Sequence, residues 1–349
     1  MLKNRFVKLG LSAALALGLL SGGVFSAAAQ DMPPLPGEAV IGDLNAPRGL
    51  AFDANGNLIV AVAGSGGDVT LTIPGPEGEQ PMSLGMSGRI ISIAPDGTAT
   101  DWIGGFPSYA GAMETIGLYR AIPQGDSLWV IFSGSGAATS GAFWMDSVVE
   151  LDAATLAVKR VINLNDFEVQ NDPDGAGYDS NVSDIAWGAD GTLYITDAGG
   201  NDLLSWTEEG GLQLVHAWMD NPVPTGVEVA ENGDLYISFL GAGLAPGAAK
   251  IEHWSNGELV ETFGGLNAVS DILLDGETLY AVELVVFGEQ GPGPGRVISV
   301  NAEGATPVAE GLIAPFGIAK GPDGALYVSY GTIAFAPGMT GGVVKLAGM

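Results

Sequence analysis

The sequence predicts an all-β protein, a six-bladed β-propeller with four-stranded blades in which the N-terminal and C-terminal strands close the ring. A double-hairpin phrase recurs six times, its last copies are 42, 43 and 48 residues apart, and the two chain ends supply complementary strands. A blade needs about 40–45 residues, so the last intervals fit bare blades. We expect twenty-four strands and no helix.

The repeated phrase is a short apolar strand, a turn containing glycine, and a second strand rich in β-branched and aromatic residues. A second hairpin follows each copy, as in the segment GRIISIAPDGTATDWI. Alternating apolar and polar residues around Asp-Gly or Asn-Gly turns are strong hairpin signals. The first two intervals, 69 and 66 residues, carry insertions. The copies begin at Gly49, Gly117, Asp184, Gly226, Asp271 and Gly317.

The chain ends predict how the ring closes. GGVVKLAG, from Gly341, fits the third strand of the last blade, and EAVIGDL, from Glu38, fits its missing fourth strand. Pairing them removes an exposed sheet edge. A right-handed β-solenoid is the alternative, but its repeats are shorter and lack the double hairpin.

Residues 1–29 have the pattern of a signal peptide, and residues 30–349 form one predicted propeller domain. The chain has a basic start, an apolar run over residues 9–20 that is too short to span a bilayer, and an A-x-A site at Ala27 and Ala29. We therefore expect a cleaved signal peptide and a secreted or periplasmic protein.

The composition excludes several classes of function. The net charge of −28 disfavours nucleic acid and anionic lipid as partners, because both repel an acidic surface. The absence of cysteine excludes disulfides, thiolate nucleophiles and cysteine-ligated metals. We expect a monomer without membrane insertion, whose partner is an unknown protein, glycan or small molecule.

Long connections accumulate on one predicted face of the propeller, whereas the turns on the other face are tight. Loops on a rigid scaffold are where binding sites usually lie, so this face is the predicted working face. The long segments are Ser65 to Ser87, Ser133 to Ser147, Asn163 to Asn181, Leu240 to Ala248, Leu284 to Gly295 and Thr332 to Thr340.

Two acidic pairs stand out when the repeats are aligned. Asp184 and Asp271 begin the innermost strands of two repeats, and Asp197 and Glu283 end the strands that follow. We expect Asp184 opposite Asp197 and Asp271 near Glu283, where like charges need compensation. A shared proton, a nearby arginine or lysine, or a bound cation would supply it.

The sharpest hypothesis is a metal site formed by these four acids. All the candidate ligands are oxygens, which favours Ca²⁺, and Asn181 and Asn201 could add neutral oxygens. The alternative is that the carboxylates cap turns or accept backbone N–H groups. Trp144, in an inserted loop, is a further candidate for binding.

Histidine catalysis has little support, because His216 and His253 both fall in outer hairpins, away from the predicted axis. No residue is assigned a catalytic role. The segment from Asp172 to Gly175 suggests a calcium loop but lacks the twelve-residue ligand pattern, which favours a solvated turn.

The stretches FEVQNDPDGAGYDSN and DAGGNDLL, with VPTGVEV and PGAAKIEHW, resemble the ScyD/ScyE family of exported, NHL-repeat-like propellers. The resemblance runs from about Leu44 to the C-terminus. It implies a six-bladed propeller, and some members are encoded with enzymes that make the pigment scytonemin. It does not imply an activity.

Three functions follow. The leading one is a non-catalytic exported propeller that binds a ligand through its long-loop face. The second is a Ca²⁺-dependent hydrolase similar to six-bladed gluconolactonases, although Asn45-Ala46-Pro47-Arg48 stands where that family has a glutamate. The third, a quinone-dependent sugar dehydrogenase, would need a basic, histidine-containing centre that the sequence lacks.

Overall fold

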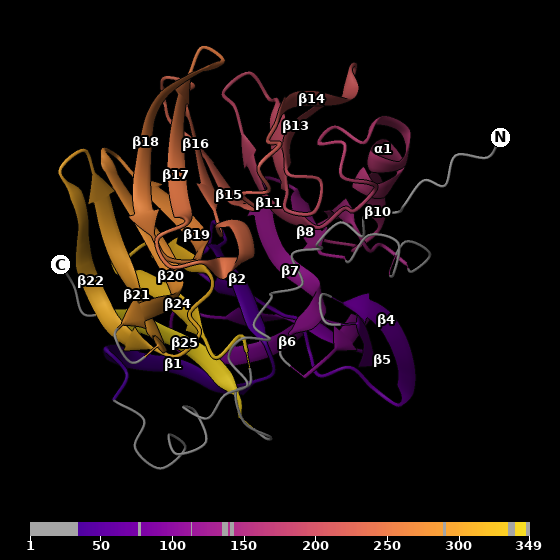
Figure 1. Ribbon diagram of the computed structural model, residues 1–349. Coiled ribbons are helices and arrows are strands. Elements are labelled where there is room, and N and C mark those ends of the chain that lie inside the picture. Colours follow the sequence, from indigo (N-terminus) through magenta and orange to yellow (C-terminus); the bar gives the residue numbers. More distant parts are fainter. Residues whose placement is uncertain are drawn as a thin grey trace.

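The computed structural model describes residues 34–75, 78–112, 114–134, 139, 143–288, 291–333 and 339–346. The predicted signal peptide, residues 1–29, lies outside these ranges. Within them the protein is an all-β propeller built from antiparallel sheets (Figure 1). Four of the sheets have the four strands of a propeller blade, and a fifth sheet has nine strands.

In each four-stranded sheet, neighbouring strands pair antiparallel. The first sheet has the order β1 (Gly37–Leu44), β25 (Gly341–Leu346), β24 (Leu326–Tyr330) and β23 (Ile318–Lys320). The second is β11 (Val182–Trp187), β12 (Leu193–Asp197), β13 (Asp202–Thr207) and β14 (Gly211–Ala217). The third is β15 (Pro224–Val229), β16 (Leu235–Phe239), β17 (Ala249–Ser255) and β18 (Glu258–Leu266). The fourth is β19 (Val269–Asp275), β20 (Thr278–Gly288), β21 (Gly291–Asn301) and β22 (Gly304–Leu312).

The nine-stranded sheet joins two repeats that we expected to be separate. Near the end of β6, Ser108 pairs with Gly117 of β7 and Ala110 pairs with Thr115. The connection between the two strands is so short that β6 turns directly into β7. The strands are β2 (Pro47–Phe52), β3 (Leu58–Val62), β5 (Gly78–Ile93), β6 (Ala99–Ala110), β7 (Thr115–Gln124), β8 (Ser127–Phe132), β9 (Ser147–Asp152) and β10 (Val158–Asn163), with β4 (Val69–Gly75) paired to β5.

The predicted pairing of the first strand with the last is confirmed. Strand β1 pairs antiparallel with β25, with Glu38 opposite Lys345 and Ile41 opposite Val343 (Figure 1). The N-terminal strand thereby covers the edge that the C-terminal strand would otherwise expose.

The expectation of no helix is wrong. Helix α1 (Leu164–Asn171) and a short 3₁₀ helix (Ala242–Leu244) lie in two of the predicted long segments. Asn163 caps α1 by accepting a hydrogen bond from the Asp166 N–H, and Asp172 ends it in the left-handed conformation. Among the described residues, no helix is long and apolar enough to cross a membrane.

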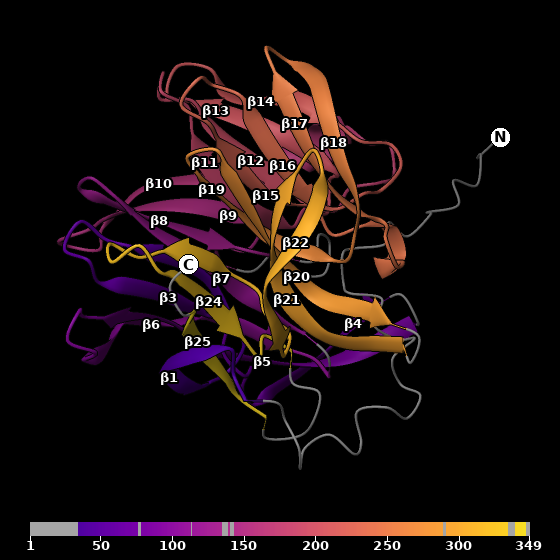
Figure 2. The same ribbon diagram turned by 90° about the vertical axis from the view of Figure 1, so that its left-hand side faces the viewer.

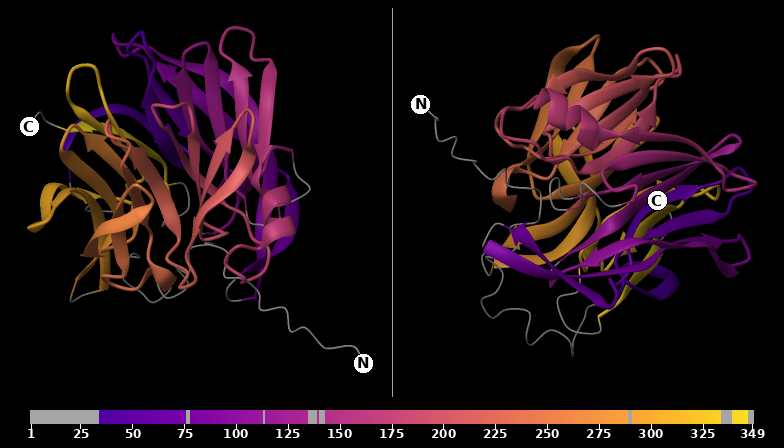
Figure 3. Two further views of the ribbon diagram at one scale, coloured as in Figure 1. Left: turned by 90° about the horizontal axis from the view of Figure 1, so that it is seen from above. Right: turned by 90° about the vertical axis from the view of Figure 1, so that its right-hand side faces the viewer.

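Apolar side chains fill the spaces between neighbouring sheets. One cluster joins Trp129 and Ile131 of β8 to Ile185 and Ile195 of the adjacent sheet. The sheets stack around a common axis in this way (Figure 3). The 3₁₀ helix and the β4–β5 and β20–β21 hairpins extend at the same end of the molecule (Figure 2).

Candidate functional site

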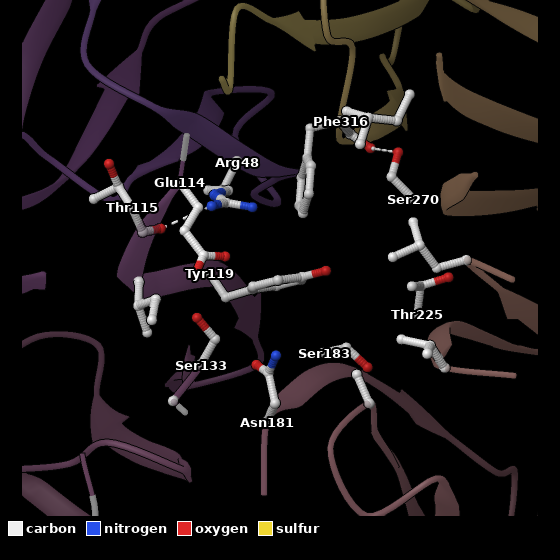
Figure 4. A pocket seen from close by; sticks show the side chains of 16 residues that line it. Arg48, Glu114, Thr115, Tyr119, Ser133, Asn181, Ser183, Thr225, Ser270 and Phe316 are labelled. Atoms are coloured by element: carbon white, nitrogen blue, oxygen red, sulfur yellow. Dashed lines mark hydrogen bonds between the residues drawn. The ribbon is translucent and has the colours of Figure 1, made fainter. Parts of the chain in front are cut away.

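A pocket of about 60 Å³ lies on the axis, where the innermost strands of all the repeats begin. Ser133, Asn181, Leu240 and Leu284, each at one end of a predicted long segment, also line it, so the pocket opens on the long-loop face. The innermost strands contribute Arg48, Ile116, Ser183, Thr225 and Ser270, and Phe316 lies two residues before the innermost strand β23. Figure 4 labels all of these residues except Ile116.

Each of these innermost residues directly precedes a position in the column that the sequence singled out. Adjacent side chains on a strand point to opposite faces, so a shift of one residue changes the environment completely. The aligned glycines are tightly enclosed: a Cβ on Gly317 would lie 2.6 Å from the carbonyl oxygen of Arg48. The residue that precedes the aligned position in each repeat is therefore the one that lines the pocket, and the same repeat alignment identifies it.

The hydroxyl groups in the pocket wall already have partners. Ser183, Thr225 and Ser270 each donate a hydrogen bond of 2.8–3.0 Å to a backbone carbonyl oxygen of the next repeat. These bonds hold successive inner strands together. The main role of the three hydroxyl groups is therefore structural. Because each hydroxyl proton is already donated to a carbonyl oxygen, these groups are poor nucleophiles.

Arg48, Glu114 and Tyr119 give the pocket its chemistry. Arg48 Nη2 donates to the Thr115 carbonyl oxygen at 2.7 Å, and its guanidinium carbon lies 4.5 Å from the centre of the Phe316 ring. The Tyr119 side chain reaches toward the centre of the pocket, and Glu114 lies beside Arg48 (Figure 4). The guanidinium is therefore fixed in place with an acid and a phenol next to it.

Burial controls the ionisation of this group. It raises the pKa of Glu114 to about 7, against the opposing charge of Arg48. It also lowers the pKa of Arg48 and raises the pKa of Tyr119. A carboxyl group with a pKa near neutrality can accept a proton under physiological conditions.

Asp184 and Asp271 lie beside the axis, where Arg120 bridges them. Arg120 Nη1 is 3.0 Å from Asp184 Oδ1, and Nη2 bonds to Asp271. Burial raises the pKa of Asp184 to about 7 although Arg120 opposes it, and burial also raises the pKa of Asp271. The two aspartate charges outweigh desolvation and raise the pKa of Arg120. The sequence left open whether a shared proton, a basic residue or a cation compensates the negative charges of these acids. For Asp184 and Asp271, the compensating group is the basic residue Arg120.

The predicted opposition of Asp184 and Asp197 is off by one residue. Asp184 pairs with Thr196 rather than Asp197, because the register shifts after Val182. The same shift places Asp271 opposite Val282. Asp197 and Glu283 each follow directly after the residue that pairs with the first acid. Their side chains therefore point to the other face of the sheet.

Asp197 and Glu283 instead accept hydrogen bonds from the segments that precede the inner strands, and Asp197 also fixes the β12–β13 turn. Asp197 accepts hydrogen bonds from Ser180 Oγ and from the backbone N–H groups of Asn181, Gly199 and Gly200, at 2.6–3.1 Å. Glu283 accepts the Asn267 N–H at 2.7 Å and bonds to the side chain of Arg296. Both carboxylates have the turn-capping arrangement that was the alternative to metal binding.

The other candidate binding residues have different environments. Asn181 lines the pocket, and its Oδ1 has no hydrogen-bond partner in the described part of the chain. Asn201 is 4% exposed and its side chain bonds to Asp174, to Gly199 and to the Val223 N–H. Asn201 therefore holds loops together.

Trp144 is partly buried, and its ring packs against two aromatic rings of the core. The ring centre lies 5.6 Å from that of Phe132 and 6.3 Å from that of Phe106. Its neighbour Phe143, 64% exposed, stacks on it from outside. The tryptophan anchors its loop, and Phe143 is the aromatic ring that faces outward.

The axial acids do not fit a metal ion. The guanidinium of Arg120 lies between Asp184 and Asp271 and would repel a cation placed there. Within the described ranges, no three Asp, Glu, His or Cys side chains form a group that could hold a metal ion.

The comparisons with known proteins show the fold. No family model matches the chain, and no curated protein does. Among solved structures, the putative oxidoreductase (glucose dehydrogenase) of Thermus thermophilus is 19% identical with a TM-score of 0.55, covering 90% of this chain and 100% of that chain.

Two further structures are similar over nearly the whole chain. The gluconolactonase of Xanthomonas campestris is 12% identical with a TM-score of 0.55, covering 92% of this chain and 93% of that one. Regucalcin of Agrobacterium tumefaciens, a calcium-binding protein, is 13% identical with a TM-score of 0.53, covering 90% and 96%. These similarities show that the fold is a β-propeller. They do not show membership of the ScyD/ScyE family.

Proposed function

We propose that the protein is a small-molecule hydrolase of the lactone and ester class, acting in the axial pocket. The observation that carries this proposal is the convergence of Arg48, Glu114 and Tyr119 in one pocket on the axis. The likeness to a gluconolactonase supports the same class of substrate.

The size of the pocket suggests which part of a substrate enters it. A cavity volume of about 60 Å³ holds roughly four water molecules, because about 10–15 Å³ of such volume is enough for one. It accommodates an ester or lactone carbonyl group and a water molecule, with the rest of the substrate lying over the long-loop face. The Arg48 guanidinium would bind the carbonyl oxygen and stabilise its developing negative charge.

Glu114 is the proposed general base. Its carboxylate would accept a proton from the attacking water, and its pKa of about 7 suits that role. When the acyl C–O bond breaks, the Glu114 carboxyl group would return the proton to the alcohol oxygen that leaves. Asn181, with an unpartnered Oδ1 at the pocket, would hold the water. The proposed reaction needs no metal, which departs from the Ca²⁺-dependent hydrolase considered from the sequence, because Arg120 occupies the axial acids.

The test is turnover of a panel of five- and six-membered lactones and aryl esters, with chelator or with Ca²⁺. We expect turnover that survives the chelator and increases as the pH rises through about 7, as Glu114 ionises. Glu114→Gln should lower kcat/KM by roughly 100-fold or more, the usual contribution of a general base.

Glu277→Gln, a neutralisation at an exposed turn, is the matched control and should leave turnover unchanged. Thermal unfolding of each variant shows that it is folded. Full activity in Glu114→Gln, or turnover that requires Ca²⁺, contradicts the proposal.

The second candidate is non-catalytic binding of a small carbonyl or carboxylate compound in the same pocket. The small volume and the structural use of the wall hydroxyls favour it. Lactone binding measured by calorimetry without any turnover would select this candidate over the hydrolase.

We further propose a six-bladed, exported propeller of the ScyD/ScyE type. The nine-stranded sheet divides into β2–β3–β5–β6 and β7–β8–β9–β10, each with the strand number of a blade, and the two sets meet at the short β6–β7 pairing. The signal pattern of residues 1–29 supports export. Sequencing the N-terminus of the protein purified from outside the cytoplasm tests the cleavage after Ala29.

A further inference from the structure

The two segments on which the ScyD/ScyE resemblance chiefly depends, residues 167–181 and 197–202, meet beside the axial pocket, to whose lining each contributes one residue, Asn181 and Ala198. Asn201 Nδ2 donates to Asp174 Oδ2 at 3.0 Å, and Ser180 Oγ donates to Asp197 Oδ2 at 2.6 Å. Helix α1 carries Glu168 into this junction, and Asp202 begins β13 beside it. Of these two segments, the proposed hydrolase uses only Asn181, and it does not use Glu168 or Asp202.

Glu168 and Asp202 are both 0% exposed, and none of their four carboxylate oxygens has a hydrogen-bond partner in the described structure. A Cβ on Gly200 would lie 2.6 Å from Glu168 Oε1 and 3.3 Å from Asp202 Oδ2, so both groups approach one backbone position. The two carboxyl groups are within hydrogen-bonding reach of each other. Two facing carboxylates need either a proton or a cation between them.

The surroundings supply further negative charge. Burial, followed by the charge of Asp197, raises the pKa of Glu168 to about 8, and the same causes raise the pKa of Asp202. The charge of Asp174 also acts on both groups. No ion pair between described residues brings a lysine or arginine to Glu168 or Asp202.

A neutral oxygen is present on the same helix. Asn165 lies three residues before Glu168, which places both on one face of α1. Asn165 is 7% exposed, and its Oδ1 has no hydrogen-bond partner in the described structure. The buried face of α1 thus presents unpartnered oxygen atoms where a helix normally presents apolar side chains.

We propose that Glu168 and Asp202, with Asn165 Oδ1, hold a divalent cation of the calcium type that fastens α1 to the β12–β13 turn. Carboxylate and amide oxygens are calcium ligands, and two carboxylates balance the charge of one Ca²⁺. Water and backbone carbonyl groups commonly complete such a coordination shell. The site is structural and differs from the four acids considered from the sequence.

The first test is calorimetric titration of CaCl₂ into the full-length protein after removal of bound metal with a chelator. We expect one Ca²⁺ per chain and, at saturation, a rise in Tm of roughly 5 °C, because a ligand that binds only the folded state stabilises it. The absence of both binding and a Tm change at millimolar Ca²⁺ overturns the site.

Amide variants of the two proposed carboxylate ligands, which keep the shape of the side chain and remove its charge, test whether the ion binds at this position. Glu168→Gln and Asp202→Asn should each weaken Ca²⁺ binding by roughly 100-fold, since affinity depends on ligand charge. Asp166→Asn removes an exposed charge from the same helix and should leave binding unchanged. Wild-type affinity in folded Glu168→Gln contradicts the proposal, and if both variants fail to fold, the wild-type titration decides.

A shared proton is the competing outcome. In that case the free energy of unfolding does not change when Ca²⁺ is added, but it increases as the pH falls below about 8. This result would mean that a proton, and no cation, lies between Glu168 and Asp202. None of these measurements uses lactone turnover, so the metal site and the hydrolase succeed or fail independently.

Discussion

Two groups of buried acids in this molecule are compensated differently. Asp184 and Asp271 beside the axis share the guanidinium of Arg120, and each accepts a backbone N–H from the next repeat. Glu168 and Asp202 beneath α1 are as deeply buried, but their charged neighbours are other acids. Burial of a charged group is expensive unless it is paired. Deep burial of a pair of acids therefore does not by itself indicate one kind of site.

The largest expected effect comes from removing the positive partner of the axial acids. Arg120→Met leaves Asp184 and Asp271 buried without a counter-charge, and should lower the free energy of unfolding by about 3–5 kcal/mol. Chemical denaturation at pH 7 measures it. Adding Asp184→Asn and Asp271→Asn to Arg120→Met should recover much of the loss, because no buried charge remains unpaired. A small loss in Arg120→Met alone would mean that the axial charges are better solvated than their burial indicates.

A smaller loss is expected at the acid that fixes a turn with hydrogen bonds. Asp197→Ala removes the acceptor for three backbone N–H groups and one hydroxyl, but it also relieves repulsion of Glu168 and Asp202. The net loss of stability should be about 2 kcal/mol. Denaturation of Asp197→Ala in parallel with wild type checks it. Unchanged stability would indicate that repulsion in the cluster offsets all four hydrogen bonds.

The smallest effect concerns pH dependence near the axis. Burial, followed by the charges of Asp184 and Asp271, raises the pKa of Glu228 to about 8 from its ordinary value of 4.5. Between these values the folded state binds more protons than the unfolded state, so stability is present at low pH and is lost as the pH rises toward 8. The full shift would amount to about 3 kcal/mol between pH 5 and pH 8. Because Glu228 is only partly buried, solvent screening reduces this, and Glu228→Gln should lessen the fall in unfolding free energy by about 1 kcal/mol. Identical pH profiles for variant and wild type would contradict the shift.

The candidate site could be predicted from the sequence only in part. The repeat alignment brings the strand ends that line the pocket to one face, and Asn181 is among the residues that line it. The register shifts after Val182 and Val269 depend on local backbone geometry, and they change which side chains face the axis. Arg120 reaches Asp271 across 151 positions of the chain, a contact that no repeat pattern encodes.

Helix α1 shows the same limit in the local structure. Its N-cap, Asn163, is a residue type that favours helix starts. Its buried face, however, consists of Leu164, Asn165 and Glu168, so the apolar periodicity that reveals most helices is missing. Because Asn165 and Glu168 are polar, the sequence pattern does not show that they lie on the buried face of α1, and it therefore does not indicate the proposed cation site.

By itself, the sequence determined the β-propeller and the closure of β1 on β25, because alternation, turn residues and repeat length are local properties that repeat along the chain. Only the tertiary structure decided that β6 and β7 join two repeats in one sheet, and that Arg120 rather than a metal lies between Asp184 and Asp271. Those outcomes depend on register and on contacts between distant residues, which are fixed only when the sheets pack around the axis.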